Sequence, residues 1–292
     1  MTDFKNAKEL LELCDAGGLR ISDVMRTREI ELGETSGEEA DRRMGEAFRI
    51  MRQSAVTPVE TPGRSMGGLI GGEAKKLSDH RRLGKGLCGP VLGRAITYAM
   101  AVLETNASMG LIVAAPTAGS SGIVPGLLLA MQEEYELTDA QMVQSLYNAG
   151  AVGYLAMRNA TVAGAVGGCQ AEVGVASAMA ASAAAELMGG SPVQCLDAAS
   201  TVLMNMLGLV CDPVGGLVEY PCQNRNAAGV ANGLIAAEMA LSGIRQRIPL
   251  DEMIAVMYTV GKRMPVELRE TALGGCATAP SACSACGGCA GA

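Results

Sequence analysis

The sequence predicts an all-α protein: a single large, mostly helical domain with glycine- and proline-rich functional loops and a mobile C-terminal tail. Alternating β-branched runs, which are typical of strands, are nearly absent. Segments such as EVGVASAMAASAAAELMGG are too long and too rich in alanine to be strands. The chain has no Trp, 2 Phe and 6 Tyr, against 18 Met and 38 Gly. We therefore expect a core of closely packed small and flexible side chains.

The domain organisation follows from a change of composition along the chain. We expect one domain over residues 1–275, with charged helices in 1–60 and an apolar core that holds the functional loops in 61–275. Residues 276–292 are rich in Cys, Gly and Ala. A tail of small residues buries little apolar surface, so we expect it to be mobile.

Several helix boundaries are marked by local signals. Residues 4–18, FKNAKELLELCDAGG, have apolar positions at helical spacing and end at a Gly-Gly pair. A Ser or Thr that precedes a Glu or Gln by three residues predicts three further helix starts. These pairs are Ser36 with Glu39, Thr138 with Gln141, and Ser191 with Gln194.

The middle of the chain is nearly uncharged. Between 105 and 218 only nine of 114 residues carry a charge, so helices there must be buried on most sides. Residues 105–132 carry none, which is a pattern also found in membrane spans. Pro116, Pro125 and the polar residues between them interrupt this stretch, and we assign it to the protein interior.

Charge and cysteine content exclude several classes of protein. A net charge of −7 and a pI near 4.9 argue against nucleic-acid or anionic-membrane partners. The N-terminal MTDFKNAKELLEL has acidic residues and no long apolar run, so we expect no signal peptide and a cytoplasmic location. Ten cysteines in a cytoplasmic protein are core thiols, metal ligands or catalytic groups rather than a disulfide framework.

Three cysteines occur where glycine or proline breaks a helix: Cys169 after Gly-Gly, Cys211 before Asp-Pro, and Cys222 after Pro. Thiolates beside free backbone amides suit an iron–sulfur cluster, and three ligands leave one iron open to act as a Lewis acid. The alternative is three buried structural thiols, since free Cys is commonly buried. Separations of 42 and 11 residues match no compact cluster motif, so the residues alone leave both interpretations open.

Two glycine-rich stretches are candidate anion sites. In PTAGSSGIVPG, at 116–126, glycines let the backbone approach a ligand, hydroxyl groups supply donors, and Pro125 lies near the start of a helix. Such an arrangement would hold a carboxylate, although a tight helix–helix turn with capping Ser and Thr is the alternative. SMGGLIGGE, at 65–73, is a second candidate of the same kind.

The tail contains Cys283, Cys286 and Cys289 in a C-x-x-C-x-x-C pattern. The pattern is similar to the start of a ferredoxin cluster run, but the fourth cysteine of that run is missing. Zinc also requires a fourth ligand, and the single histidine, His80, is far away in the sequence. A thiol of the tail could still reach a metal held elsewhere in the fold.

Taken together, these stretches resemble the iron–sulfur-dependent L-serine dehydratases, in particular the separate α-chain of the two-chain form. The resemblance covers nearly the whole chain from RISDVMRTREIELGE onward. Its most specific pieces are SMGGLIGGEAKKL, ETNASMGLIVAAPTAGSSGIVPG, GGCQAEVGVASAMAA, LGLVCDPVGGLVEYPCQNRNA and ELRETALGGCATAP.

The resemblance implies a [4Fe–4S] cluster on Cys169, Cys211 and Cys222 in a mostly helical catalytic domain. The implied reaction converts L-serine to pyruvate and ammonia without pyridoxal phosphate, with an open iron as Lewis acid. The resemblance also implies that two loops bind the substrate, through Thr117, Gly119, Ser120, Ser121 and Gly122, with Ser65, Gly67 and Gly68 behind them.

In this family a cysteine near the C-terminus covers the open iron until substrate displaces it, and by position Cys283 is the candidate here. Cys276, Cys286 and Cys289 depart from the usual pattern and leave the capping thiol open. The base is open too, with Lys75, Lys76 and His80 as candidates.

The family's second domain usually carries a serine- and histidine-containing motif, which this chain lacks. We therefore expect a separate β-chain to complete the site, and a higher oligomer. The alternatives are the same chemistry on L-cysteine or L-threonine, or a non-catalytic iron–sulfur sensor subunit. A sensor would need no carboxylate site, so PTAGSSG argues against it.

Overall fold

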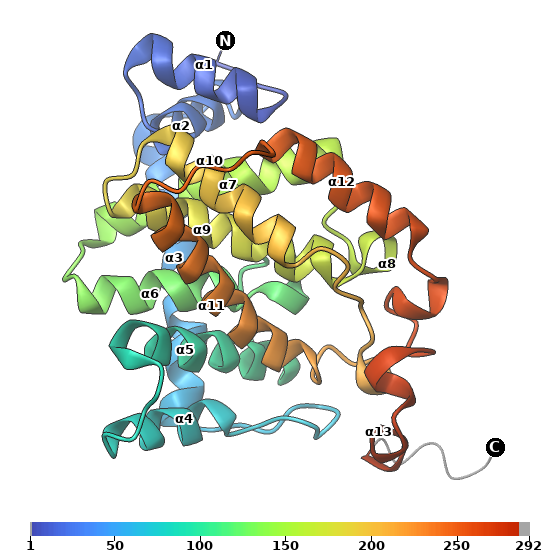
Figure 1. Ribbon diagram of the computed structural model, residues 1–292. Helices are drawn as coiled ribbons and strands as arrows, with labels where there is room; N and C mark the ends of the chain where they lie inside the picture. The colour runs from blue at the N-terminus through green and yellow to red at the C-terminus, as the bar shows by residue number, and fades with distance from the viewer. Residues whose placement is uncertain (1, 286–292) are drawn as a thin grey trace.

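The structure is a computed structural model that describes residues 2–285, with the side chains of residues 2–282. Over this part of the chain it contains helices and no β-strand, which confirms the predicted all-α class (Figure 1). The α-helices are α1 Ala7–Gly17, α2 Ile21–Leu32, α3 Gly37–Glu60, α4 Glu73–Arg82, α5 Gly89–Ala107, α6 Ile123–Glu134, α7 Asp139–Asn159, α8 Gly164–Gly167, α9 Val175–Leu187, α10 Pro192–Asn205, α11 Cys222–Leu241, α12 Leu250–Arg263 and α13 Pro280–Ala285.

The predicted helix boundaries agree closely with the structure. Helix α1 ends at Gly17, and Gly18 adopts the left-handed conformation, with φ of 61°, that stops the helix. Complete capping boxes begin α7 at Thr138 and α10 at Ser191. At the start of α3 only half of the box forms: Ser36 accepts from the Glu39 backbone N–H, whereas the Glu39 carboxylate binds two arginines of the next turn.

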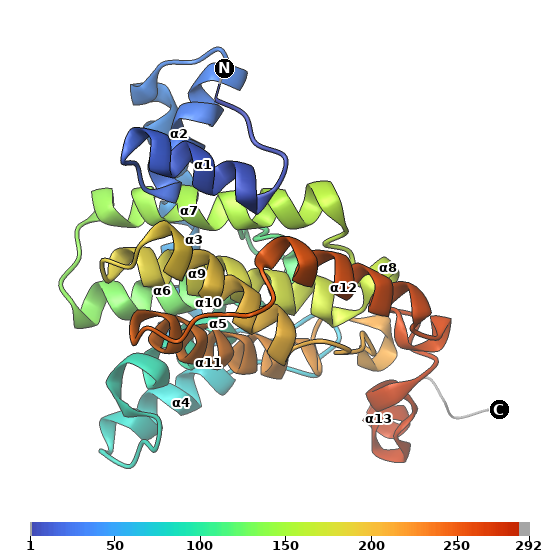
Figure 2. The ribbon, with the colours of Figure 1, turned by 45° about the horizontal axis from the view of Figure 1, so that its top comes forward.

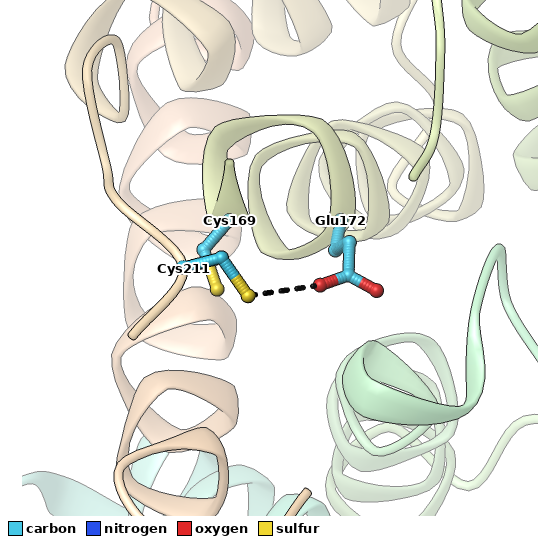
Figure 3. A group of neighbouring side chains, drawn as sticks. All are labelled: Cys169, Glu172 and Cys211. Atoms are coloured by element: carbon cyan, nitrogen blue, oxygen red, sulfur yellow. Dashed lines mark hydrogen bonds between the residues drawn. The ribbon is translucent and has the colours of Figure 1, made fainter. Parts of the chain in front are cut away.

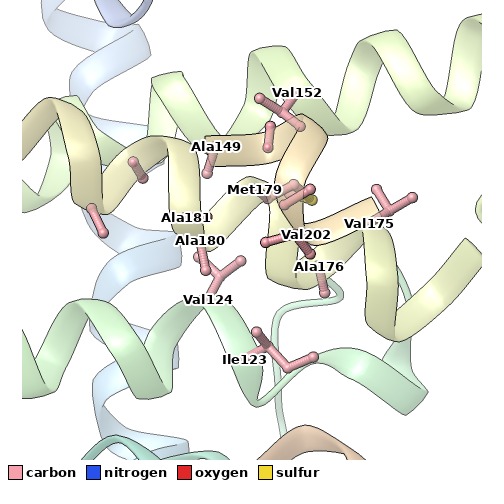
Figure 4. Packing of buried hydrophobic residues seen from close by; sticks show 14 of the residues in the cluster. Ile123, Val124, Ala149, Val152, Val175, Ala176, Met179, Ala180, Ala181 and Val202 are labelled. Carbon is pink, nitrogen blue, oxygen red and sulfur yellow. The ribbon is translucent and has the colours of Figure 1, made fainter. Parts of the chain in front are cut away.

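Helix α9 is the centre of the molecule, with α6, α7, α10 and α11 packed around it (Figure 2). Nearly every residue of α9 is buried, and most are Ala or Ser. Figure 4 shows how Val175, Ala176, Met179 and their neighbours on α9 meet Ile123 of α6 and Val152 of α7. A helix that is covered on nearly all sides has few positions for charge, and α9 carries one, Glu186 near its end, which accounts for its part of the uncharged middle of the sequence.

Small residues allow the helices around α9 to approach closely. At Gly229 of α11, an added Cβ atom would lie 2.7 Å from both Ser177 Oγ on α9 and Ile123 Cδ1 on α6. A side chain there would collide with the side chains of Ser177 and Ile123. The abundance of Gly and Ala and the scarcity of aromatics therefore have one cause, which is the short distance between buried helices.

The prediction that residues 105–132 lie in the protein interior holds for only part of the segment: residues 120–131 are buried, whereas Met109 and Leu111 are exposed. The segment forms the end of α5, a loop and the buried helix α6, whose residues 123–131 are all buried. None of the described helices is long and apolar enough to cross a membrane.

Candidate metal centre and substrate loops

Cys169 and Cys211 are brought together from segments 42 residues apart. Cys169 follows the short helix α8 and begins a π-helical turn, Gln170–Gly174. Cys211 lies in the extended segment after α10, where its backbone pairs with the segment at Arg269. Both thiols are buried, and they lie beside each other with Glu172 facing them (Figure 3). One ligand atom from each of the three residues lies within 4.8 Å of the others, a spacing that can hold a metal ion.

Glu172 completes this group from the π-helical turn that follows Cys169. The Cys211 thiol donates to its Oε2 atom at 3.8 Å, and the Thr117 hydroxyl also bonds to the carboxylate. Burial raises the pKa of Glu172 above that of an exposed carboxyl, although the bond from Thr117 opposes the shift. A half-buried carboxylate that bonds both to a thiol and to a loop hydroxyl links the two predicted sites.

Cys222 is the first residue of α11 and is also buried. Burial, and after it the nearby Cys169 and Glu172, raise the pKa of its thiol to about 12. A hydrogen bond with Cys169, together with burial, raises the pKa of Cys211 far above its usual value. Thiols with such pKa values keep their protons unless a cation binds, because a bound metal favours the thiolate.

Arg225 places a largely buried positive charge beside these thiols. Its Nη1 atom donates to Cys169 Sγ at 3.6 Å and to the Val210 carbonyl at 2.9 Å, and it lies 2.6 Å from Asp212 Oδ1. The other oxygen of Asp212 accepts from the Cys276 backbone N–H at 2.6 Å. Arg225 and Asp212 thus join the cysteines to the C-terminal segment.

Glycines leave space beside the thiols. At Gly164 an added Cβ atom would lie 2.5 Å from Glu172 Oε2 and 3.1 Å from Cys211 Sγ. Gly168, with φ of 72°, sets the turn before Cys169, and an added Cβ there would lie 2.8 Å from the Leu209 carbonyl oxygen. The glycines of TVAGAVGGC (161–169) therefore allow close approach at the site.

The loop PTAGSSG lies against the same group. Thr117 bonds to Glu172 and shares a 3.1 Å hydrogen bond with Ser120. Gly119 lies beside the Glu172 carboxylate, because an added Cβ would be 3.6 Å from Oε1. The amide side chain of Asn226 on α11 holds the loop at both ends, through the Gly122 N–H at 3.1 Å and the Gly119 carbonyl at 2.8 Å. The Ser121 hydroxyl donates to the Ala118 carbonyl inside the loop.

The SMGG loop joins the segment between Cys211 and Cys222. Ser65 Oγ donates to Glu219 Oε2 at 2.6 Å, and the Gly67 N–H donates to Oε1 at 2.6 Å. The Gly68 N–H donates to Ser65 Oγ at 3.1 Å. Two of the three residues predicted here as substrate contacts therefore already bind a carboxylate of the chain itself.

The candidate bases are not brought to the cysteines. Lys75 and His80 lie on α4, which is at the other end of the molecule from α8 in both views (Figures 1 and 2). Lys75 pairs with Asp79 at 3.3 Å, and His80 is exposed. Lys76, on the same helix, pairs with Glu73 at 3.5 Å.

The tail cysteines differ in what the structure describes. Cys276 is exposed and lies in a short 3₁₀ turn, Gly275–Thr278. The backbone of Cys283 belongs to α13, but its side chain lies outside the described part of the structure, as do Cys286 and Cys289. The prediction that Cys283 covers an open iron stays a prediction.

Residues 16–277 match the model of the family described as serine dehydratase alpha chain. The chain belongs to this family. It is 49% identical over 278 residues to a probable L-serine dehydratase, alpha chain, of Bacillus subtilis, covering 95% of this chain and 92% of the relative. It is 42% identical to the L-serine dehydratase, alpha chain, of Peptoniphilus asaccharolyticus, covering 94% of both chains. It is 37% identical to the L-serine dehydratase TdcG of Escherichia coli, over 94% of this chain and 62% of that longer protein.

Membership of the serine dehydratase alpha chain family agrees with the resemblance inferred from the motifs. Sequence reasoning nevertheless missed three residues of the site: Glu172, Glu219 and Arg225. A signal for Glu172 existed, because it is one of the few charges in the uncharged middle and follows Cys169 by three residues. Glu219 and Arg225 flank Cys222 by three residues on each side, but nothing in the sequence indicates their partners.

Proposed function

We propose that this chain is the catalytic α-chain of a cytoplasmic enzyme that deaminates L-serine by dehydration to pyruvate and ammonia, without pyridoxal phosphate. The observation that carries the proposal is the convergence of Cys169, Cys211, Glu172 and Thr117 at one place. This convergence joins a metal-binding set to a hydroxyl- and glycine-rich loop. The L-serine dehydratase alpha chains among its relatives support the same substrate.

We further propose that Cys169, Cys211 and Cys222 hold a [4Fe–4S] cluster. The chemistry of the donor set fits such a group, because the thiols of Cys169 and Cys211 lie together with the Cys222 thiol near them, all three are buried, and a cation there would favour their deprotonated form. An iron with an open position supplies a Lewis acid, which weakens the bond to a poor leaving group such as hydroxide. Arg225 would stabilise the thiolate of Cys169 by hydrogen bonding.

The α-proton of serine requires a base, and the position of Glu172 supports this role better than the positions of Lys75 and His80. Its carboxylate lies beside Cys211, and burial moves its pKa upward toward neutral pH, where a general base works best. Replacing Glu172 with Gln keeps the shape and removes the proton acceptor. We expect kcat to fall about 10²- to 10⁴-fold with the iron content retained. Loss of iron together with activity would make Glu172 a ligand instead.

Substrate contacts are proposed for Thr117, Gly119, Ser120, Ser121 and Gly122. Ser65, Gly67 and Gly68 are proposed to support the site from behind these residues, because their hydrogen-bonding groups are bound to Glu219 or to one another. A separate β-chain is proposed as the partner that completes the site. The names of two relatives as alpha chains support this, as does the greater length of TdcG, of which this chain spans 62%.

The experiment is anaerobic purification and iron–sulfur reconstitution, followed by measurement of pyruvate from L-serine with and without a co-expressed β-chain. We expect about four irons per chain, and turnover only when both chains are present. L-Threonine and L-cysteine serve as comparison substrates, and faster turnover of either would reassign the substrate. Iron without turnover of any of the three would support a sensor subunit.

A further inference from the structure

Glu219 is a buried carboxylate whose two oxygens accept hydrogen bonds from the SMGG loop. It is 3% exposed, and it accepts from Ser65 Oγ at 2.6 Å, from the Gly67 N–H at 2.6 Å and from the Leu69 N–H at 2.9 Å. No ion pair to Glu219 occurs within residues 2–285. A buried carboxylate without a cationic partner is stable only if such donors bind it. The buried donors would in turn lose their acceptor if the carboxylate were removed.

The loop is shaped around this carboxylate. Ser65 Oγ donates to Glu219 and accepts from the backbone N–H groups of Gly68 and Ile70, at 3.1 and 3.3 Å. At Gly67 an added Cβ atom would lie 2.3 Å from Leu217 Cδ1 and 2.8 Å from Glu219 Oε1. The backbone of the loop therefore rests directly on the segment that carries Glu219.

A second carboxylate fixes the far end of the same loop. Glu104 of α5 accepts from the Gly72 and Ala74 N–H groups at 3.0 and 2.9 Å. It also accepts from the Gln223 side chain at 3.2 Å. Gln223 is the neighbour of Cys222 on α11. Both ends of the loop are thus tied to the residues that surround one predicted cluster ligand.

The tied segments also line an open pocket of about 320 Å³. Its walls are Leu69 of the SMGG loop, Val214 and Tyr220 of the cysteine segment, and Cys276 with the residues that follow it. Any displacement of residues 65–69 would change the width of this pocket. The wall position depends on Glu219, because Leu69 is held by its carboxylate.

We propose that Glu219 is a positioning residue for the dehydratase reaction. It fixes the loop at 65–69 against the Cys211–Cys222 segment and occupies the Gly67 and Leu69 amides, so these amides do not bind the substrate carboxylate. The substrate carboxylate then depends on the hydroxyl groups and amides of PTAGSSG. This inference rests on the proposed function, and its test includes a measurement that needs no turnover.

The first arm measures hydrogen–deuterium exchange at residues 65–70 in the full-length chain. Replacing Glu219 with Ala removes a group of the size and charge of acetate. We expect the Gly67 and Leu69 amides of E219A to exchange about ten- to a hundredfold faster, since bonds to a charged acceptor are lost. Added acetate should restore protection, and chloride at equal ionic strength should not. The matched control is Glu238→Ala, at an exposed position on α11.

The second arm uses the reconstituted enzyme with its β-chain. In E219A we expect KM for L-serine to rise more than kcat falls, with the iron content kept and acetate lowering KM again. Glu219→Gln, which keeps the side-chain volume, should show the same direction of change and covers the case in which E219A fails to fold. Unchanged exchange and unchanged KM in both variants would overturn the proposal. An inactive wild-type enzyme would contradict the proposed function alone, because the exchange arm would still test Glu219.

Discussion

The guanidinium of Arg225 donates to the thiol of Cys169 across 3.6 Å, so a buried cation lies beside a predicted iron ligand. The two residues belong to different helical segments 56 positions apart. Arg225 reaches the thiol from the first turns of α11, the helix that Cys222 begins. The helix start therefore supplies both a candidate ligand and a charge that favours thiolates.

Arg225→Met should therefore lower both stability and iron binding. The change leaves Asp212 buried and unpaired, and we expect a loss of about 3–5 kcal/mol in the free energy of unfolding. Arg225→Lys keeps a positive charge that can pair with Asp212, so its loss should be smaller. Urea denaturation and iron per chain after reconstitution measure the two effects. Equal iron binding by wild type and R225M would contradict the role of Arg225 at Cys169.

Cys222→Ala should abolish cluster assembly although Cys222 is not in the tightest group of ligand atoms. Cys195→Ala is the matched control, because Cys195 is also a buried thiol but lies in α10. We expect the visible absorption and iron content of the first variant to vanish and those of the second to stay near wild type. Retention of iron by C222A and C211A alike would refute the ligand assignment.

Gly164→Ala should weaken metal binding at the site by steric means. The new methyl group would lie 2.5 Å from Glu172 Oε2 and 3.1 Å from Cys211 Sγ, so one of these groups must move. The control is Gly150→Ala in α7, where the nearest atom to an added Cβ is Met25 Cε at 3.9 Å. We expect G150A to gain about 0.5–1 kcal/mol of helix stability. Iron titration under anaerobic conditions should show weaker binding in G164A only.

Acid should weaken the contact between α2 and α3. Arg26 donates twice to Asp41, at 2.7 Å each, and these bonds lower the pKa of Asp41 below its usual 3.8. A lowered carboxyl pKa stabilises the fold above pH 3.8, and the contribution disappears as the pH falls through the folded-state pKa.

Asp41→Asn should therefore reduce the free energy of unfolding near pH 7 by no more than about 1 kcal/mol, because both side chains are partly exposed. The difference from wild type should vanish in strong acid. The control is Glu12→Gln, which removes a pair of more exposed groups at 3.9 Å and should change little. Denaturation from pH 2 to 7 checks both, and a difference that grows toward acid would refute this account.

Local signals in the sequence determined the fold class and several helix starts. Thr138 with Gln141 and Ser191 with Gln194 act within four residues, so their effect can be read without knowing the fold. The uncharged middle and the abundance of Gly and Ala predicted buried, closely packed helices, and α9 is such a helix. The family resemblance came from motifs of the same kind, each continuous in sequence.

Only the tertiary structure decided which groups meet. Ser65 and Glu219 are 154 residues apart, and nothing local to either indicates their hydrogen bond. Glu172 appeared in the sequence as one isolated charge, and the packing of the Cys211 segment against the π-helical turn made it a neighbour of two thiols. The physical reason is the separation in sequence of the residues that interact. Helix caps and hydrophobic periodicity depend on residues in adjacent turns, whereas a site depends on how buried helices pack and place their loops.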